Sequence, residues 1–96
     1  MAPMCLVLLI YVKPLAEVDV HRAAHVAWIE GCIEKSMMLL AGRRSPPTGG
    51  VLLFRGEADA VTEAAANDPF VQNGVATFEV VPFTATLAME DIGDLL

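Results

Sequence analysis

Two histidines, His21 and His25, are the residues of this chain best suited to acid–base chemistry, and they stand four positions apart. An imidazole changes protonation near neutral pH, so it can serve as a general acid or base. Histidines at this spacing on a helix can also share a metal ion, but the spacing indicates no third ligand, and we expect no metal site. Two simpler interpretations stay open: His21 is solvated, and His25 is a satisfied, half-buried histidine.

A histidine that works as a base is often oriented by a carboxylate, which fixes its tautomer and stabilises its cation. Asp68 is the candidate, because it lies in a connection from a helix to a strand and can reach the first helix from there. The alternative is a plain helix cap, since Pro69 fits the first position of a short helix that Asp68 would cap. Spacing alone does not choose between these two roles.

Other potential motifs are weaker. Cys5 and Cys32 lie in no redox pattern and are too few for a disulfide framework, so we expect buried thiols. Gly49-Gly50 has neither the lysine nor the spacing of a phosphate-binding loop. Arg43, beside Arg44 in a turn, is either solvated or able to clamp an acidic ligand.

Apolar patterning predicts the elements that position these groups. Apolar runs predict strands at 4–12, 37–41, 51–54 and 75–81. Helical spacing predicts helices at 18–35 and 57–66, the first capped by Asp19, and the segment 42–50 is predicted as a turn. The order β-α-β-β-α-β predicts an α+β, ferredoxin-like fold, in which a four-stranded antiparallel sheet carries two helices on one face.

The predicted sheet has more apolar surface than two helices can cover. The first strand is apolar on both sides, with Leu6 and Leu8 on one and Val7 and Leu9 on the other. A bare face of roughly several hundred Å² exceeds what a soluble monomer usually exposes. We therefore expect a homodimer whose sheets pack face to face.

Length and charge indicate how many domains the chain has and which kinds of partner it is expected to lack. The 96 residues predict one domain, 1–96, whose residues 84–96 form an acidic tail. A net charge of −6 argues against nucleic acid as a partner. The longest apolar run, 5–12, is far shorter than the ~20 residues of a membrane helix. A signal peptide requires basic residues near its start, and no Lys or Arg precedes Lys13. We therefore expect a cytoplasmic protein without a membrane partner.

Three ordered blocks between Leu6 and about Phe83 resemble the YciI-like, or YCII-related, small proteins. The blocks are Arg22-Ala-Ala-His25-Val26; Leu39-Leu40-Ala41-Gly42 followed by Gly49-Gly50; and Asn67-Asp68-Pro69-Phe70-Val71 followed by Gly74-Val75, Phe78-Glu79-Val80 and Pro82-Phe83. The resemblance implies a dimeric α+β barrel in which His25 and Asp68 form the family's His/Asp site.

This chain departs from the family pattern at two positions. Many relatives have Pro where Arg43 stands, and some carry an acid where Lys13 stands. Both residues are expected near the mouth of the pocket, so the class of substrate can differ. His21 does not match the family pattern and is left out of the site.

The resemblance implies a small-molecule enzyme of the lyase or isomerase type that needs no metal or organic cofactor. A His/Asp pair suits proton abstraction from a hydroxylated aromatic or quinone-like substrate, followed by elimination, such as dehydrohalogenation, or by isomerisation. We expect His25 to be the base or acid and Asp68 to orient it. The predicted substrate-binding residues are Tyr11, Arg22, Arg43 and Phe70. The alternatives are a non-catalytic metabolite-binding accessory protein and a cofactor-free monooxygenase of the same barrel fold.

Overall fold

The computed structural model describes residues 2–96. The strands are β1 (Ala2–Tyr11), β2 (Met38–Arg43), β3 (Gly49–Arg55) and β4 (Ala76–Ala85). The helices are α1 (Leu15–Val20), α2 (Arg22–Glu34), α3 (Ala58–Ala66), α4 (Pro69–Gln72) and α5 (Glu90–Gly93). None of the helices in this described part has both the length and the hydropathy needed to span a bilayer.

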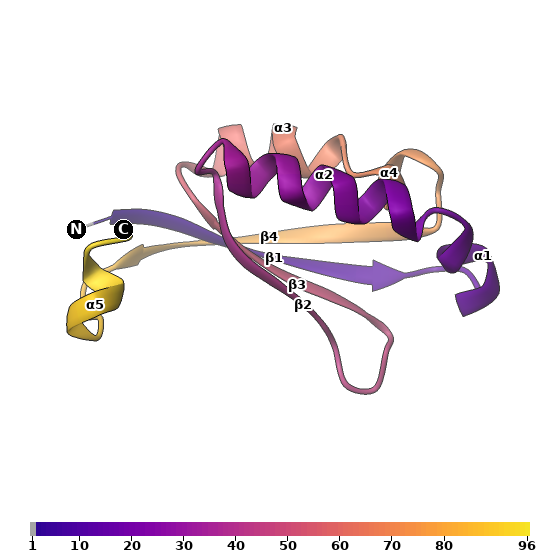
Figure 1. Ribbon diagram of the computed structural model, residues 1–96, viewed down its shortest axis with the longest axis horizontal. Coiled ribbons are helices and arrows are strands. Elements are labelled where there is room, and N and C mark those ends of the chain that lie inside the picture. The colour runs from indigo at the N-terminus through magenta and orange to yellow at the C-terminus, as the bar shows by residue number, and fades with distance from the viewer. Residues whose placement is uncertain (1) are drawn as a thin grey trace.

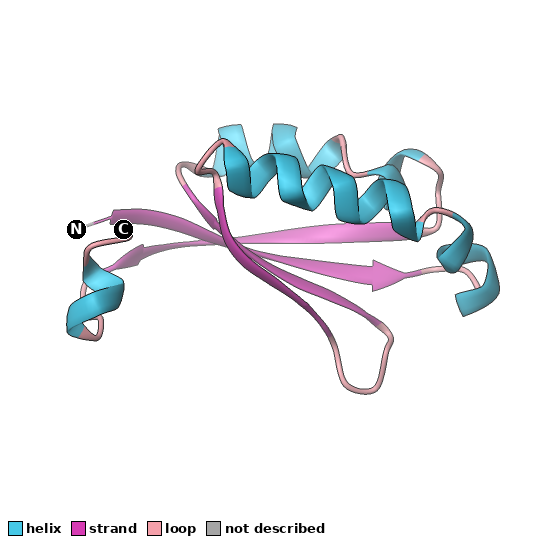
Figure 2. Ribbon diagram, viewed as in Figure 1, coloured by secondary structure: helices cyan, strands magenta, loops and turns pink. Residues whose placement is uncertain are grey.

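The four strands form one antiparallel sheet in the order β2-β3-β1-β4. Helices α2 and α3 lie side by side over one face of this sheet (Figure 1). The short helix α5 lies on the opposite side at one end of the sheet, so most of that other face carries no helix among residues 2–96. The short helices α1 and α4 lie near the same end of the sheet (Figure 2). The predicted α+β, ferredoxin-like arrangement is confirmed.

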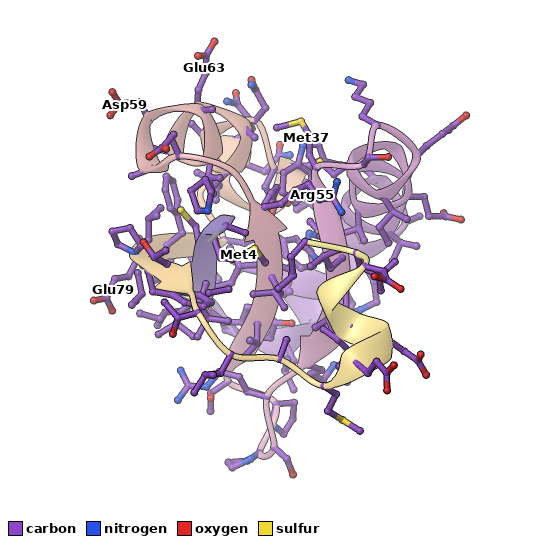
Figure 3. The ribbon with its side chains drawn as sticks, turned by 90° about the vertical axis from the view of Figure 1, so that its left-hand side faces the viewer. Met4, Met37, Arg55, Asp59, Glu63 and Glu79 are labelled. Carbon is purple, nitrogen blue, oxygen red and sulfur yellow. The ribbon has the colours of Figure 1, made fainter. Side chains whose placement is uncertain are left out.

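The core lies between the sheet and the two long helices. Alternate side chains of β1 face the helices, so Val7 and Leu9 are at most 1% exposed. Helix α3, which covers this face, contributes Val61, and Val61 is fully buried. The outer side of α3 turns Asp59 and Glu63 away from the sheet (Figure 3). Helix α3 therefore has the apolar inner face and charged outer face that its sequence pattern predicts.

The uncovered face of the sheet is apolar at its centre, and β4 adds two polar residues to it, Thr77 opposite Ile10 and Glu79 opposite Leu8. The strand register places Leu6 between Leu53 of β3 and Val81 of β4, and Leu53 lies opposite Leu40 of β2. Paired residues share a face, so these side chains form one surface across all four strands. Leu40 and Val81 are 55% and 37% exposed. Strands that are apolar on both sides therefore leave apolar side chains of the second face exposed.

The helix predicted over 18–35 is in fact two helices that meet at His21. Helix α1 begins earlier than expected because the carbonyl of Pro14 accepts the first helical hydrogen bond, from the N–H of Val18. At His21 the backbone leaves the helical conformation, with φ −104° and ψ 7°. The prediction that Asp19 caps the helix was wrong, because Asp19 lies inside α1.

All four strands are longer than predicted, because glycine and proline did not end them. Strand β2 includes Gly42 and β3 begins at Gly49, so the turn covers 44–48 rather than 42–50. Strand β4 continues past Pro82 into the segment predicted as tail. A proline is tolerated there because β4 lies at the edge of the sheet.

The close approach of Gly49 to β1 gives a test of this register. A Cβ at Gly49 would overlap the backbone carbonyl of Leu9, whereas one at Gly31 in α2 would meet nothing within 4 Å. We expect Gly49→Ala to lower the free energy of unfolding by about 1–3 kcal/mol, as overpacking does. Gly31→Ala should instead raise it by up to ~1 kcal/mol, because alanine favours helix. Urea unfolding followed by circular dichroism measures both, and equal stabilities would contradict the pairing of β1 with β3.

Candidate active site

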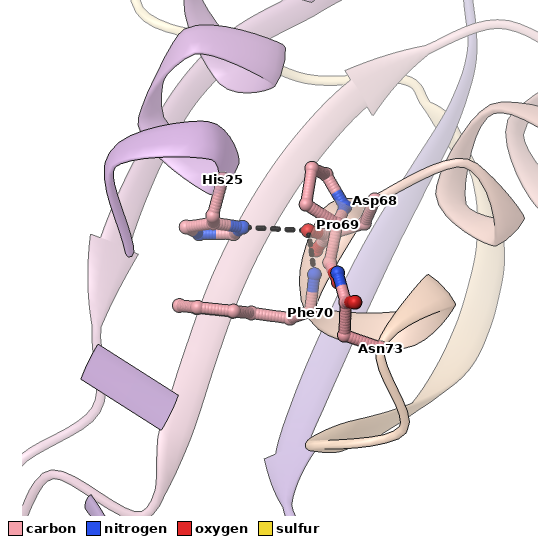
Figure 4. Close-up of polar contacts among 5 residues, drawn as sticks. All are labelled: His25, Asp68, Pro69, Phe70 and Asn73. Atoms are coloured by element: carbon pink, nitrogen blue, oxygen red, sulfur yellow. Dashed lines mark hydrogen bonds and ion pairs between the residues drawn. The ribbon is translucent and has the colours of Figure 1, made fainter. Parts of the chain in front are cut away.

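His25 and Asp68, 43 positions apart in the sequence, meet in the protein interior. Nδ1 of His25 lies 2.8 Å from Oδ1 of Asp68 (Figure 4). The exposed fractions are 7% for His25 and 0% for Asp68. A carboxylate only accepts hydrogen bonds, so this contact assigns the ring hydrogen to Nδ1. Nε2 then carries the lone pair, which makes it the atom of His25 that can take up a proton.

Asp68 is held in place by the helix that it caps. The N–H of Phe70 donates to the same Oδ1 at 2.9 Å, and Pro69 fills the first position of α4. Asp68 therefore fills both roles that its sequence position left open, as a helix cap and as the partner of His25. Its second oxygen, Oδ2, is buried and has no hydrogen-bond partner among residues 2–96.

Phe70 is the common neighbour of three polar side chains. Its ring stacks on the imidazole of His25, with centroids 3.9 Å apart and planes inclined by 12° (Figure 4). Tyr11 meets the same ring edge-on, with centroids 5.8 Å apart. The guanidinium carbon of Arg22 lies 5.6 Å from the ring centroid. Because Phe70 is fully buried, it fixes where these three groups lie relative to one another.

Arg22 is anchored across the junction of α1 and α2 by Asp19. Its Nε donates to Oδ1 of Asp19 at 2.9 Å, and a terminal nitrogen lies 2.7 Å from the same oxygen. Burial lowers the pKa of Arg22, but Asp19 and Tyr11 outweigh burial and raise this pKa above its usual value. Arg22 therefore keeps its positive charge throughout the physiological range.

A pocket of about 260 Å³ opens beside this cluster, between α2 and the sheet. Its polar lining comes from Tyr11, Arg22, His25 and Arg43. The rest of its lining is apolar or glycine, namely Val26, Ile29, Ala41, Gly42, Gly50 and Leu52. Pockets for drug-sized ligands usually measure about 300–1,000 Å³, so this one suits a smaller molecule of about one ring.

The sequence profile of the YCII-related domain matches residues 4–84. The chain belongs to the YCII-related family. No curated protein sequence gives a significant match.

Two solved structures share the fold of this YCII-related protein. One is the 5-chloro-2-hydroxyhydroquinone dehydrochlorinase TftG of Burkholderia phenoliruptrix AC1100, in complex with 2,5-dihydroxybenzoquinone, with 21% identity and a TM-score of 0.68. The match covers 88% of this chain and 95% of TftG. The other is SnoaB, a cofactor-independent oxygenase from Streptomyces nogalater, with 17% identity and a TM-score of 0.53. That match covers 94% of this chain and 99% of SnoaB.

The structure brings all six predicted site residues of the YCII-related protein into one region. Tyr11, Arg22, His25 and Arg43 line the pocket. The prediction that Phe70 contacts the substrate was wrong, because Phe70 is fully buried and does not line the pocket. Asp68 and Phe70 support the pocket through their contacts with His25. His21 lies at the junction of α1 and α2 and does not line the pocket.

The apolar walls of the pocket were not predicted from the sequence. In a sequence, Val26, Ile29 and Leu52 cannot be told from core residues. The signal that pointed to part of the wall is the second family block, because it contains Gly42 and Gly50, which both line the pocket.

Neither cysteine is prepared to act as a nucleophile. Burial raises the pKa of the Cys5 thiol, and the carboxylate of Glu57 raises it further. Burial also raises the pKa of Cys32, where Asp68 adds to the effect and Lys35 opposes it. Within residues 2–96, no three His, Cys, Asp or Glu side chains cluster in a way that could hold a metal ion.

Removing the carboxylate of Asp68 tests the hydrogen bonds of the site. Asp68→Ala leaves two buried N–H groups, on His25 and Phe70, without an acceptor, and each costs about 1–3 kcal/mol. We therefore expect the free energy of unfolding to fall by about 2–6 kcal/mol, and by less in Asp68→Asn, which keeps an acceptor oxygen. The matched control is Asp59→Ala on the exposed side of α3, which should change stability by at most about 0.5 kcal/mol. If urea unfolding gave Asp68→Ala and Asp59→Ala the same stability, the assigned bonds would be wrong.

Proposed function

We propose that this YCII-related protein is a small-molecule enzyme of the lyase or isomerase type, with His25 as its proton-transfer group. The observation that carries the proposal is the buried bond from Nδ1 of His25 to Asp68, beside a pocket that His25 itself lines. The carboxylate fixes the tautomer, leaves Nε2 as the base and stabilises the imidazolium that forms. The fold likeness to TftG, a dehydrochlorinase of a chlorinated hydroxyhydroquinone, supports a hydroxylated aromatic or quinone-like substrate.

Elimination from a halogenated hydroquinone needs only proton transfers. Nε2 of His25 takes the proton of one ring hydroxyl, whose bonding electron pair becomes part of a carbonyl as the ring tautomerises. The imidazolium returns that proton to the carbon that bears the halogen. Loss of a proton from the second hydroxyl then expels the halide with its bonding pair, and the products are a quinone and one equivalent of hydrogen halide. On a ring without a leaving group, the first two transfers alone isomerise the substrate.

The fold likeness to SnoaB supports a second candidate, a cofactor-free monooxygenase. Its reaction starts with the same deprotonation at His25, after which the electron-rich ring reacts with oxygen. Halide release without oxygen uptake identifies the lyase, and oxygen uptake with a hydroquinone identifies the oxygenase. Ligand binding with neither reaction identifies a non-catalytic metabolite-binding protein.

The two histidines provide a matched test of the proposed base. We expect His25→Ala to reduce halide release from halogenated hydroquinones by about 100-fold or more, because acid–base groups contribute that much to a rate. His21→Ala removes the same side chain outside the pocket and should leave the rate within about twofold. Turnover of His25→Ala within about threefold of the unchanged protein would exclude the mechanism.

We also propose that a second copy of the chain covers the uncovered face of the sheet. Ile10, Leu40, Val81 and Phe83 are between 37% and 55% exposed on the strands of that sheet. Cross-strand pairs join them to Leu6 and Leu53 in a continuous apolar surface, and large surfaces of this kind mark protein–protein contacts. A two-fold pair of such faces buries both copies of the surface at once.

Placing a charge on that face tests the proposed dimer. We expect the unchanged protein to sediment at micromolar concentration with twice the mass of the chain. Ile10→Glu should shift it to one chain mass, because an unpaired carboxylate would be buried between the sheets. Val20→Glu is the control, since Val20 is 75% exposed on α1. A single-chain mass for the unchanged protein would refute the dimer.

A further inference from the structure

The lining of the pocket is cationic although the protein is acidic. The chain has six Lys and Arg residues and a net charge of −6. Two of those six, Arg22 and Arg43, line the pocket, and no Asp or Glu of residues 2–96 lines it. A recess whose charged lining has one sign raises the local concentration of ligands of the opposite sign. This distribution of charge favours an anionic ligand.

The two arginines differ in how much of their charge is available. Arg22 is paired with Asp19, which holds it within 2.9 Å. Arg43 forms no ion pair with any of residues 2–96. The charge of Arg22 is therefore largely balanced inside the protein, while the charge of Arg43 is free for a ligand.

The strand register explains why Arg43 reaches the pocket. Arg43 lies opposite Gly50 in β3, and Gly50 lies opposite Leu9 in β1. Leu9 faces the helices, and residues that pair across strands share a face, so Arg43 lies on the helix-covered side. Gly50 and Arg43 both line the pocket. The next residue, Arg44, lies outside β2 and does not line the pocket.

We propose that the pocket selects hydroxylated rings that carry a carboxylate, and that Arg43 is the residue that recognises the carboxylate. The inference rests on the proposed function for the ring and its hydroxyl groups, and it adds the acidic substituent. The apolar side chains of Val26, Ile29 and Leu52 contact the ring. One ring hydroxyl faces His25, and the carboxylate lies toward the exposed end of the pocket at Arg43. A guanidinium suits this role because it binds a carboxylate through two parallel hydrogen bonds.

Calorimetric titration with two probes separates the contribution of the carboxylate to the binding affinity from that of the ring. The probes are 2,5-dihydroxybenzoate and its uncharged counterpart, 1,4-dihydroxybenzene. We expect the protein to bind the carboxylate about tenfold more tightly, which is the low end for charge-assisted hydrogen bonds because solvent weakens the pair at the exposed Arg43. Arg43→Gln should remove most of this preference, Arg43→Lys should keep part of it, and Arg44→Gln should retain it within about twofold. The preference should also shrink as salt is added, because Arg43 is exposed to solvent.

Several outcomes would overturn the inference. They are equal binding of the two probes, failure of both to bind at millimolar concentration, and an equal loss of preference in Arg43→Gln and Arg44→Gln. Far-UV circular dichroism and thermal melting establish that each variant is folded. Because binding is measured without turnover, a carboxylate preference in an inactive protein would refute only the proposed function. Turnover that depends on His25, without a carboxylate preference, would refute only this inference.

Discussion

The hydrogen bond between His25 and Asp68 is the constraint on which the site depends. A carboxylate without exposed surface needs partners inside the protein, because its desolvation is otherwise very costly. Here the partners are the imidazole of His25 and the backbone N–H of Phe70, both at the same oxygen. The bond therefore joins α2 to the N-terminal end of α4. Since the ring of Phe70 also stacks on the imidazole, the position of the base is fixed from two directions.

The two faces of the sheet serve different purposes: one carries the core and the pocket, and the other is available for association. Its helix-covered face holds the core, and at one end of that face the small residues Gly42 and Gly50 line a pocket instead of filling it. Its other face is apolar at the centre and contributes no side chain to the His25–Asp68 contact or to the stack on Phe70. Association through that second face would thus leave the proton-transfer geometry unchanged. One continuous apolar pattern in β1 supports both faces, because alternate residues point to opposite sides.

Apolar periodicity was sufficient to predict the four strands and the two long helices in order, since burial decides both, but it did not indicate α5 in the acidic tail. It failed where a single residue acts through its backbone. Helix α1 begins at Leu15, directly after Pro14, and the helical conformation is interrupted at His21. Asp19 therefore lies inside α1, where it pairs with Arg22 instead of capping the helix. The proximity of His25 and Asp68 could not be derived from spacing, because residues 43 positions apart meet only through tertiary structure. It was anticipated from the family blocks. Nothing in the sequence indicated the stacking on Phe70, since any large apolar residue fills a core position.

Burial also determines which residues of the site tolerate substitution: the buried Asp68 and Phe70 do not, whereas the exposed Arg43 does. Substituting Asp68 or Phe70 would leave buried groups without their partners or open a cavity, so both are tied to the stability of the fold. Arg43 is exposed, has no ion-pair partner within residues 2–96 and stands opposite a glycine. Another side chain at that position would disturb neither the core nor the bond to His25. The proton-transfer chemistry and the recognition of the substrate can therefore change independently, because they depend on groups with opposite burial.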